Sequence, residues 1–236
     1  MDIEVRLNVN PFKGDSSSPV ELKKNKPFLI FSKDSGVIFS INEQDEENDV
    51  YEVLNISSKI SNDDCALIGY EYKNPLVKAP KAADMIYIHF SKTNEIAQVY
   101  VYDLKRSLGG KDIILKLIHQ LEDSLIHAKN IVASLKKYSG VYTIGVVTES
   151  YDRKKLEEQI AILQQSVVPN PNVPSFVQAK KKTQTIIDIQ ELKYIKDFYR
   201  GIVRILGVEY KVDIHYFKMQ EKVSVLEMNF IDGVLQ

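Results

Sequence analysis

Residues 96–110 read IAQVYVYDLKRSLGG. The first nine, Ile96 to Leu104, are rich in Ile, Val and Tyr, residues that are enriched in strands. A second run of this kind, Met85 to Phe90, precedes them, and the turn-like residues 91–94 (Ser-Lys-Thr-Asn) join the two runs. Two glycines, Gly109 and Gly110, then interrupt the strand pattern. We therefore predict a β-hairpin that is followed directly by a different kind of element.

The element after Gly110 is predicted to be a long helix. Its apolar residues recur at spacings of three and four, the period of one helix face, and they are Ile114, Leu117, Leu121, Leu125, Ala128, Val132 and Leu135. We expect Gly140 to end this helix and the apolar run Val141 to Val147 to form a strand buried on both faces. Asp152 is expected to cap a second helix that runs to about Gln165. This order predicts an α/β or α+β fold with a mixed central sheet flanked by helices.

Turn signals divide the chain into three parts. Residues 1–80 are predicted to form a β-rich N-terminal region, residues 81–167 the α/β core, and residues 168–236 a C-terminal helix and β-hairpin after a Pro- and Asn-rich loop at 169–174. The strands expected in the first part are Ile3 to Val9, Phe28 to Phe31, Val37 to Ile41, Val50 to Ile56 and Cys65 to Tyr72. Those expected in the third part are Val208 to Met219 and Val223 to Phe230, after a helix at about Ile189 to Leu206.

Charge and cysteine content exclude several classes of protein. The 236 residues include 31 Lys and Arg and 32 Asp and Glu, a net charge of −1 that rules out a histone-like basic binder and an acidic tail protein. The single cysteine, Cys65, excludes an intramolecular disulfide framework and a four-cysteine zinc site. The sequence contains no run of about 18 apolar residues, and its N-terminus lacks the pattern of a signal peptide. We therefore expect a cytoplasmic protein with no membrane partner.

The charge is distributed unevenly along the chain. The first 60 residues carry 7 basic and 11 acidic side chains, a net charge of −4, so that the remaining 176 residues carry +3. A surface that binds a polyanion is therefore expected outside the N-terminal region. The basic run Lys180-Lys181-Lys182 is the main candidate for contact with nucleic-acid phosphates, although such clusters are more often solvated surface.

Two carboxylates and a lysine on the predicted hairpin form the main candidate site. Side chains two apart on a strand share a face, so Asp103 and Lys105 project together. An antiparallel neighbour that starts at Asp84 can bring a second carboxylate close to Asp103. Two carboxylates and a backbone carbonyl suit Mg²⁺, and a nearby ammonium can orient a water and stabilise charge on a phosphate. Of six carboxylate-x-Lys pairs in the chain, only this one combines an acid-led strand, an apolar strand and a long helix downstream.

These residues resemble the PD-(D/E)XK nuclease superfamily, which includes restriction endonucleases and RecB-like exonucleases. Asp84 matches the first motif and Asp103-Leu104-Lys105 the second, while Gln120-Leu121-Glu122 looks like the glutamine-leucine signature of the RecB-like branch. The resemblance covers about residues 81–148. Ala83 and Ser124 depart from the proline and tyrosine that are usual in that family.

The resemblance implies a restriction-endonuclease-like core and metal-dependent hydrolysis of phosphodiester bonds. Asp84, Asp103 and the Leu104 carbonyl would hold Mg²⁺ or Mn²⁺, and Lys105 would position the attacking water. Gln120 would orient the lysine or contact a backbone phosphate. DNA is expected as the substrate ahead of RNA, and restriction or antiphage defence is the expected setting by analogy.

Other interpretations remain open at this stage. Asp103 and Lys105 can instead form an ordinary solvent-exposed pair at the end of a strand. Glutamines on a helix flank, such as Gln120, are usually structural. The chain can then be a non-catalytic nucleic-acid-binding or assembly subunit, with a partner protein or a second copy of itself. A regulator from a mobile element is a third alternative. The four histidines do not have the spacing of metal ligands.

Overall fold

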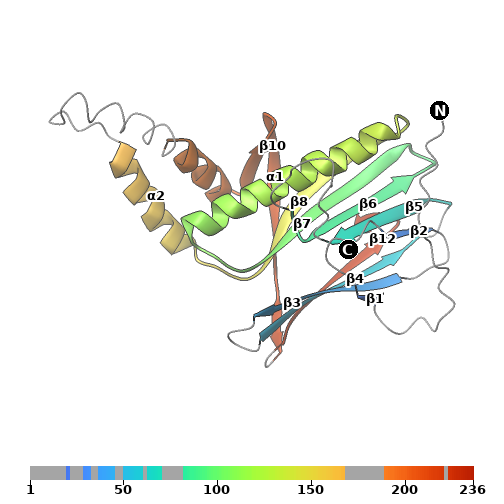
Figure 1. Ribbon diagram of the computed structural model, residues 1–236, viewed down its shortest axis with the longest axis horizontal. Helices are drawn as coiled ribbons and strands as arrows, with labels where there is room; N and C mark the ends of the chain where they lie inside the picture. Colours follow the sequence, from blue (N-terminus) through green and yellow to red (C-terminus); the bar gives the residue numbers. More distant parts are fainter. Residues whose placement is uncertain are drawn as a thin grey trace.

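The computed structural model describes residues 20–21, 29–32, 37–45, 50–60, 63–70, 82–167, 189–220 and 223–236. Two mixed β-sheets and three helices make up this part of the chain, so the predicted α+β class is confirmed (Figure 1). One sheet is central and carries the helices. The other lies against its opposite face.

The central sheet is built around the predicted hairpin. Its strand order is β2-β5-β6-β7-β8-β10-β9, in which β5, β6 and β7 are successive antiparallel neighbours and β8 runs parallel to both β7 and β10. The helix α1 connects the parallel pair β7 and β8, as a parallel connection requires. The bounds are β2 (Leu29–Ser32), β5 (Cys65–Tyr70), β6 (Met85–Ser91), β7 (Ile96–Leu108), α1 (Lys111–Ser134), β8 (Ser139–Tyr151), α2 (Arg153–Val167), β9 (Ile202–Ile205) and β10 (Val208–Tyr216).

The second sheet joins the two ends of the chain. Its order is β1-β3-β4-β12-β11, with β13 beside β12. The parallel pairing of β4 with β12 brings an N-terminal strand against a C-terminal one. The predicted boundaries near residues 80 and 167 are therefore crossed by strand pairing in both sheets. The bounds are β1 (Val20–Glu21), β3 (Val37–Asp45), β4 (Val50–Lys59), β11 (Lys218–Gln220), β12 (Val223–Ile231) and β13 (Val234–Leu235).

Alternation along the strands builds two separate cores. On one face of the central sheet, residues such as Val101 and Ile144 pack against the apolar face of α1, including Leu117 and Leu121. On the other face, aromatic side chains fill the space between the sheets, and Tyr87 stacks on Phe230 of β12 with ring centroids 4.2 Å apart. Side chains two apart on β7 therefore reach the same core, and adjacent ones reach different cores.

Several predicted elements differ from the structure at their ends. The long helix ends at Ser134, before Gly140. Residues 189–199 form the C-terminal helix, which ends earlier than predicted because Gly201 adopts φ +76° and β9 follows. Leu206 and Gly207, with φ 51° and 78°, make the tight turn into β10. The predicted cap of α2 is confirmed, since the Lys155 N–H donates to Asp152 Oδ1 at 2.9 Å.

One predicted strand is divided between the two sheets. The run Val208 to Met219 forms β10 in the central sheet and then β11 in the second sheet, and the buried Phe217 lies between them. The predicted strand Ile3 to Val9 and the loop at 169–174 lie outside the described residues. Within the described part of the chain, no helix combines the length and the apolar character needed to cross a membrane.

Candidate functional site

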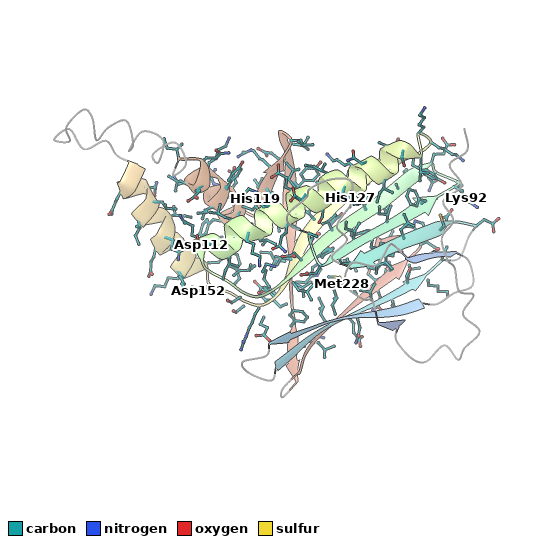
Figure 2. All side chains as sticks on the ribbon, in the orientation of Figure 1. Lys92, Asp112, His119, His127, Asp152 and Met228 are labelled. Atoms are coloured by element: carbon teal, nitrogen blue, oxygen red, sulfur yellow. The ribbon has the colours of Figure 1, made fainter. Side chains whose placement is uncertain are left out.

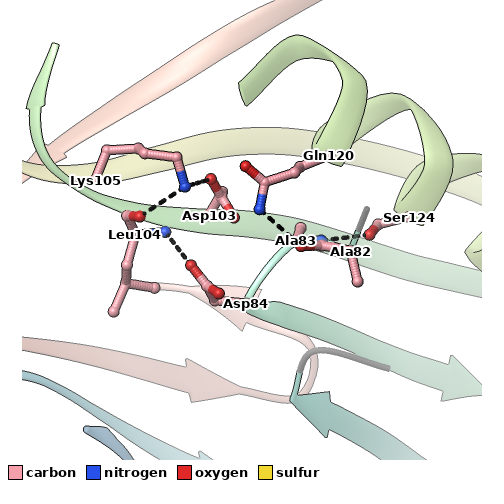
Figure 3. Close-up of polar contacts among 8 residues, drawn as sticks. All are labelled: Ala82, Ala83, Asp84, Asp103, Leu104, Lys105, Gln120 and Ser124. Carbon is pink, nitrogen blue, oxygen red and sulfur yellow. Dashed lines mark hydrogen bonds and ion pairs between the residues drawn. The ribbon is translucent and has the colours of Figure 1, made fainter. Parts of the chain in front are cut away.

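The hairpin register brings the two predicted acids together. Met85 of β6 pairs with Tyr102 of β7, so the next position outward places Asp84 opposite Asp103. Val101, Asp103 and Lys105 are two residues apart on β7 and share one face. Because Val101 belongs to the core under α1, Asp103 and Lys105 project toward the helix side of the sheet (Figure 3). The prediction that Asp103 and Lys105 share a face is confirmed, because the two side chains form an ion pair.

Three polar contacts connect Asp84, Asp103, Leu104 and Lys105. Asp84 Oδ2 accepts a hydrogen bond of 2.7 Å from the Leu104 N–H. Lys105 Nζ pairs with Asp103 Oδ2 and also donates to the Leu104 carbonyl oxygen at 3.0 Å. Asp103 is 0% exposed and Asp84 3% exposed, whereas the Lys105 side chain is 15% exposed. The carboxylates are thus enclosed, and the lysine lies between them and the surface. The interpretation of this pair as solvent-exposed is therefore wrong.

Burial and crowding change the acidity of the carboxyl pair. Removal from water raises the pKa of Asp84 well above its ordinary value, and the neighbouring Asp103 carboxyl raises it further. The Lys105 ammonium and the Leu104 N–H act in the opposite direction, with smaller effect. Two carboxyl groups this close to each other favour either a shared proton or a bound cation, because two buried negative charges repel one another.

Two side chains of α1 hold the segment that leads into Asp84. Gln120 Nε2 donates to the Ala82 carbonyl oxygen at 2.9 Å, and the Ala83 N–H donates to Ser124 Oγ at 2.7 Å (Figure 3). Gln120 and Ser124 are four residues apart, so they lie on the same helix face, one turn apart. They fix where the first carboxylate enters the site.

Gln120 therefore contacts the backbone before β6, where sequence reasoning expected a contact with the lysine or a phosphate. Its remaining polar atom, Oε1, is buried and has no hydrogen-bond partner among the described residues. Ser124 was not predicted as a site residue. The signal that could have found it is its position four residues, about one helical turn, after Gln120.

The oxygen atoms at the site suit a hard divalent cation, but the Lys105 ammonium already contacts two of them. Two carboxylates and a carbonyl are ligands that Mg²⁺ and Mn²⁺ accept. Lys105 Nζ bonds two of the three predicted ligands, Asp103 and the Leu104 carbonyl. In the described residues there is no group of three or more His, Cys, Asp or Glu side chains that could hold a metal. A metal here would therefore need water or substrate oxygens to complete its coordination.

The site lies toward the end of the central sheet at which β7 and β8 finish. The parallel strands β7 and β8 end side by side there, and the helices α1 and α2 begin there, as the labels of Asp112 and Asp152 show in Figure 2. The turns pack closely, because a Cβ on Gly109 would lie 2.9 Å from the Asp152 Cβ. Ligands of sheets with parallel strands usually bind at such carboxyl ends, so a substrate has a natural approach from this side.

Not every residue that the sequence singled out can be placed relative to this cluster. Lys180, Lys181 and Lys182 lie outside the described residues. Histidines are found elsewhere: His89 is buried with Nε2 at 3.7 Å from Asp64 Oδ2, and His215 Nε2 lies 3.3 Å from the Tyr102 hydroxyl. Tyr102 is adjacent to Asp103 on β7 and faces the other core, so that histidine is on the far side of the sheet from Lys105.

Comparisons of the chain with protein-family models, with curated proteins and with solved structures give no match. A function for this chain is therefore inferred from the geometry of its own residues.

Proposed function

We propose that this chain is a metal-dependent nuclease that hydrolyses phosphodiester bonds, with DNA favoured over RNA. The observation that carries the proposal is the enclosed pair Asp84 and Asp103 with Lys105 directly beside it. Burying two carboxylates together is unfavourable unless they hold a proton or a cation. Such an arrangement is more typical of a binding or catalytic site than of a core built for stability.

Each residue has a role that follows from its contacts. Asp84, Asp103 and the Leu104 carbonyl would hold the cation, which when bound polarises a phosphate and makes a coordinated water more acidic. Lys105, released from Asp103, would orient the attacking water and stabilise negative charge on the phosphate. Gln120 acts as a positioning residue through Ala82, because it holds the backbone immediately before Asp84.

The strand order supports the same proposal. The antiparallel run β5-β6-β7, the helix α1 and the parallel strand β8 follow one another in the order that the resemblance to PD-(D/E)XK nucleases implies. The acids occupy the hairpin of that unit, and the glutamine occupies its helix. Fold alone does not determine function, so the chemistry still rests on the carboxylate pair.

Hydrolysis tests the proposal directly. Supercoiled plasmid DNA and a folded RNA are incubated with the protein and Mg²⁺ or Mn²⁺, and nicking is compared for wild type, Asp103→Asn and Lys105→Met. We expect each variant to lose on the order of 100-fold or more in rate, the usual cost of removing one stabilising group from an active site. Activity that survives both substitutions would refute the proposal.

A matched control comes from another carboxylate-x-Lys pair of the same chain. Glu209 and Lys211 have the same spacing on β10, and both side chains are exposed. Lys211→Met should leave nicking unchanged, because this lysine is exposed and makes none of the contacts of the site. Glu209 is kept, since it pairs with Arg204. Equal loss in the site variants and in the control would indicate a general effect on the protein, whereas undiminished nicking in every variant would indicate a contaminating nuclease.

One observation favours the alternative of a non-catalytic nucleic-acid-binding or assembly subunit. Lys105 pairs with Asp103 Oδ2 and donates to the Leu104 carbonyl oxygen, two of the groups that a metal would use. Calorimetric titration with Mn²⁺ separates the two functions, because the nuclease requires binding that Asp84→Ala abolishes. Absence of Mn²⁺ binding, together with stable association with a partner protein, would support the non-catalytic function.

A further inference from the structure

A line of cations lies on the helix formed by residues 189–199. Lys193, Lys196 and Arg200 follow one another at spacings of three and four residues, so they share one helix face. Arg200 continues this face beyond the last helical residue, since its N–H donates to the Lys196 carbonyl oxygen at 3.3 Å. We call these three residues the basic stripe.

The opposite face of this helix is anchored in the core. Ile195 and Phe198 are buried in the same cluster as the apolar face of α1. At the start of the helix, Glu191 Oε2 accepts a hydrogen bond of 2.7 Å from Lys111 Nζ in the first turn of α1. The helix therefore cannot turn about its axis without losing this packing, so its exposed face keeps a fixed direction. Figure 1 shows this helix near α1.

A groove of about 300 Å³ runs along the basic stripe. The residues that line it are Ile189, Leu192, Lys193, Lys196, Asp197, Arg200 and Arg204. Its acidic member, Asp197, is ion-paired with Arg204, which also binds Glu209. Within the described residues, none of the three cations of the basic stripe forms an ion pair with an acidic side chain. The groove is thus positively charged, and that charge is available to a partner.

We propose that the basic stripe binds the phosphodiester backbone of a nucleic acid. Three cations in a row repel one another, and a regularly charged polyanion relieves that repulsion while releasing its counterions. The apolar Ile189 and Leu192 at the same groove offer contact to sugars or bases. The helix is tied to Lys111, six residues after Lys105, at the end of the sheet where β7 and β8 finish.

This inference rests on the proposed nuclease function, because it names the surface along which that substrate would lie. A nucleic acid is favoured over an acidic protein, because the proposed nuclease site needs a phosphate and the helix that carries the basic stripe is tied to the first turn of α1. The basic stripe consists of other residues than Lys180, Lys181 and Lys182, which the sequence favoured and which lie outside the described residues.

Binding without hydrolysis tests the basic stripe by itself. Fluorescently labelled duplex DNA, duplex RNA and single-stranded DNA are titrated in EDTA, and anisotropy is followed from about 0.05 to 0.2 M salt. In Lys193→Ala/Lys196→Ala/Arg200→Ala, the slope of log affinity against log salt for duplex DNA should become less steep by about 2.7, since each lost phosphate contact contributes about 0.9. We expect affinity to fall roughly tenfold or more at about 0.1 M salt.

A control variant removes the same charge elsewhere. The three lysines chosen are Lys59, Lys92 and Lys218, and all are exposed. Lys59 and Lys218 lie on the second sheet, and Lys92 lies at the far end of the molecule from Asp112 (Figure 2). Replacing these three by alanine should leave the salt slope within about 1 of the wild-type value. An equal loss in both triple variants would overturn the proposal, because the effect would then follow net charge alone.

Two further outcomes are decisive. If polyglutamate of matched charge displaces the nucleic acid as well as unlabelled DNA does, the basic stripe is a surface for acidic proteins and the proposal is wrong. If the wild-type protein binds no nucleic acid in EDTA, the proposal also fails, whatever the nicking assay gives. Binding that depends on the basic stripe without any nicking would support this inference and refute hydrolysis, so the two failures are distinguishable.

Discussion

Replacing Lys105 by methionine removes the charge that satisfies the enclosed carboxylates and keeps most of the side-chain volume. Lys105 Nζ bonds Asp103 Oδ2 and the Leu104 carbonyl, and Asp103 is 0% exposed. The variant therefore leaves Asp103 and Asp84 without their neighbouring cation. We expect lower stability at pH 8, a smaller loss at lower pH, and recovery when a divalent cation is added.

The magnitude follows from the burial of the pair. Removing one partner of a buried ion pair costs about 3–5 kcal/mol, and the 15% exposure of the Lys105 side chain places this pair at the lower end, about 3 kcal/mol. Protonation of the carboxyl pair can replace the lost cation. The free energy of protonating a carboxyl group changes by about 1.4 kcal/mol per pH unit. The stability lost by Lys105→Met should therefore shrink by up to about 2.7 kcal/mol between pH 8 and pH 6.

Urea unfolding of wild type and Lys105→Met at both pH values measures these differences. Lys211→Met, an exposed lysine on β10, serves as the control and should change stability by less than about 0.5 kcal/mol. Mn²⁺ at about 100 times its dissociation constant should restore about 2.7 kcal/mol to Lys105→Met. The variant should also bind Mn²⁺ more tightly than wild type does, because no ammonium competes for Asp103.

The result that would refute this reasoning is a loss that does not depend on pH. Such a loss would show that the lysine contributes through its methylene packing and not through its charge. A loss as small as that of Lys211→Met would have the same meaning for the ion pair. Weaker Mn²⁺ binding in Lys105→Met would show that the lysine and the metal do not compete for the same ligands.

Three further substitutions test the surroundings. Because the pKa of Asp84 is raised in the folded protein, stability should fall as pH rises from 3.8, the ordinary value, through the raised one. Asp84→Asn should abolish that fall in urea unfolding and match or exceed wild-type stability at pH 8, while losing Mn²⁺ binding in calorimetry. Ser124→Ala leaves the buried Ala83 N–H without its acceptor and should cost about 1–3 kcal/mol in the same unfolding assay. Gly145→Ala places a Cβ inside the van der Waals radius of the Tyr102 ring, and thermal unfolding should show a loss of about 1–3 kcal/mol that Tyr102→Leu partly relieves.

Local patterns account for the hairpin and the helix at the centre of this protein. The strand residues of β6 and β7 are contiguous, a short turn joins them, and Gly109 and Gly110 separate β7 from the apolar period of α1. These signals depend on neighbouring residues only, so sequence is sufficient to predict them. The proximity of Asp84 and Asp103 follows from the same hairpin, because a short connection restricts its register.

The contacts that give the candidate site its character are not local. Gln120 and Ala82 are 38 residues apart in the sequence. Their hydrogen bond forms only if α1 packs on the sheet with Gln120 beside the start of β6. The two-residue spacing of Asp103 and Lys105 likewise does not predict whether the lysine contacts Asp103, the Leu104 carbonyl or solvent. That choice depends on how completely α1 and its neighbours enclose the carboxylates.

The sequence by itself determined the order of strands and helix, the alternation that places Asp103 and Lys105 on one face, and the cap of α2. Only the tertiary structure decided that β4 pairs with β12, far along the chain from it. The same holds for the tie between α1 and the helix that carries Lys193, Lys196 and Arg200. Propensity and periodicity act over a few residues. Pairing between distant strands and the direction of a helix face are selected by burial of apolar surface, which depends on every element at once.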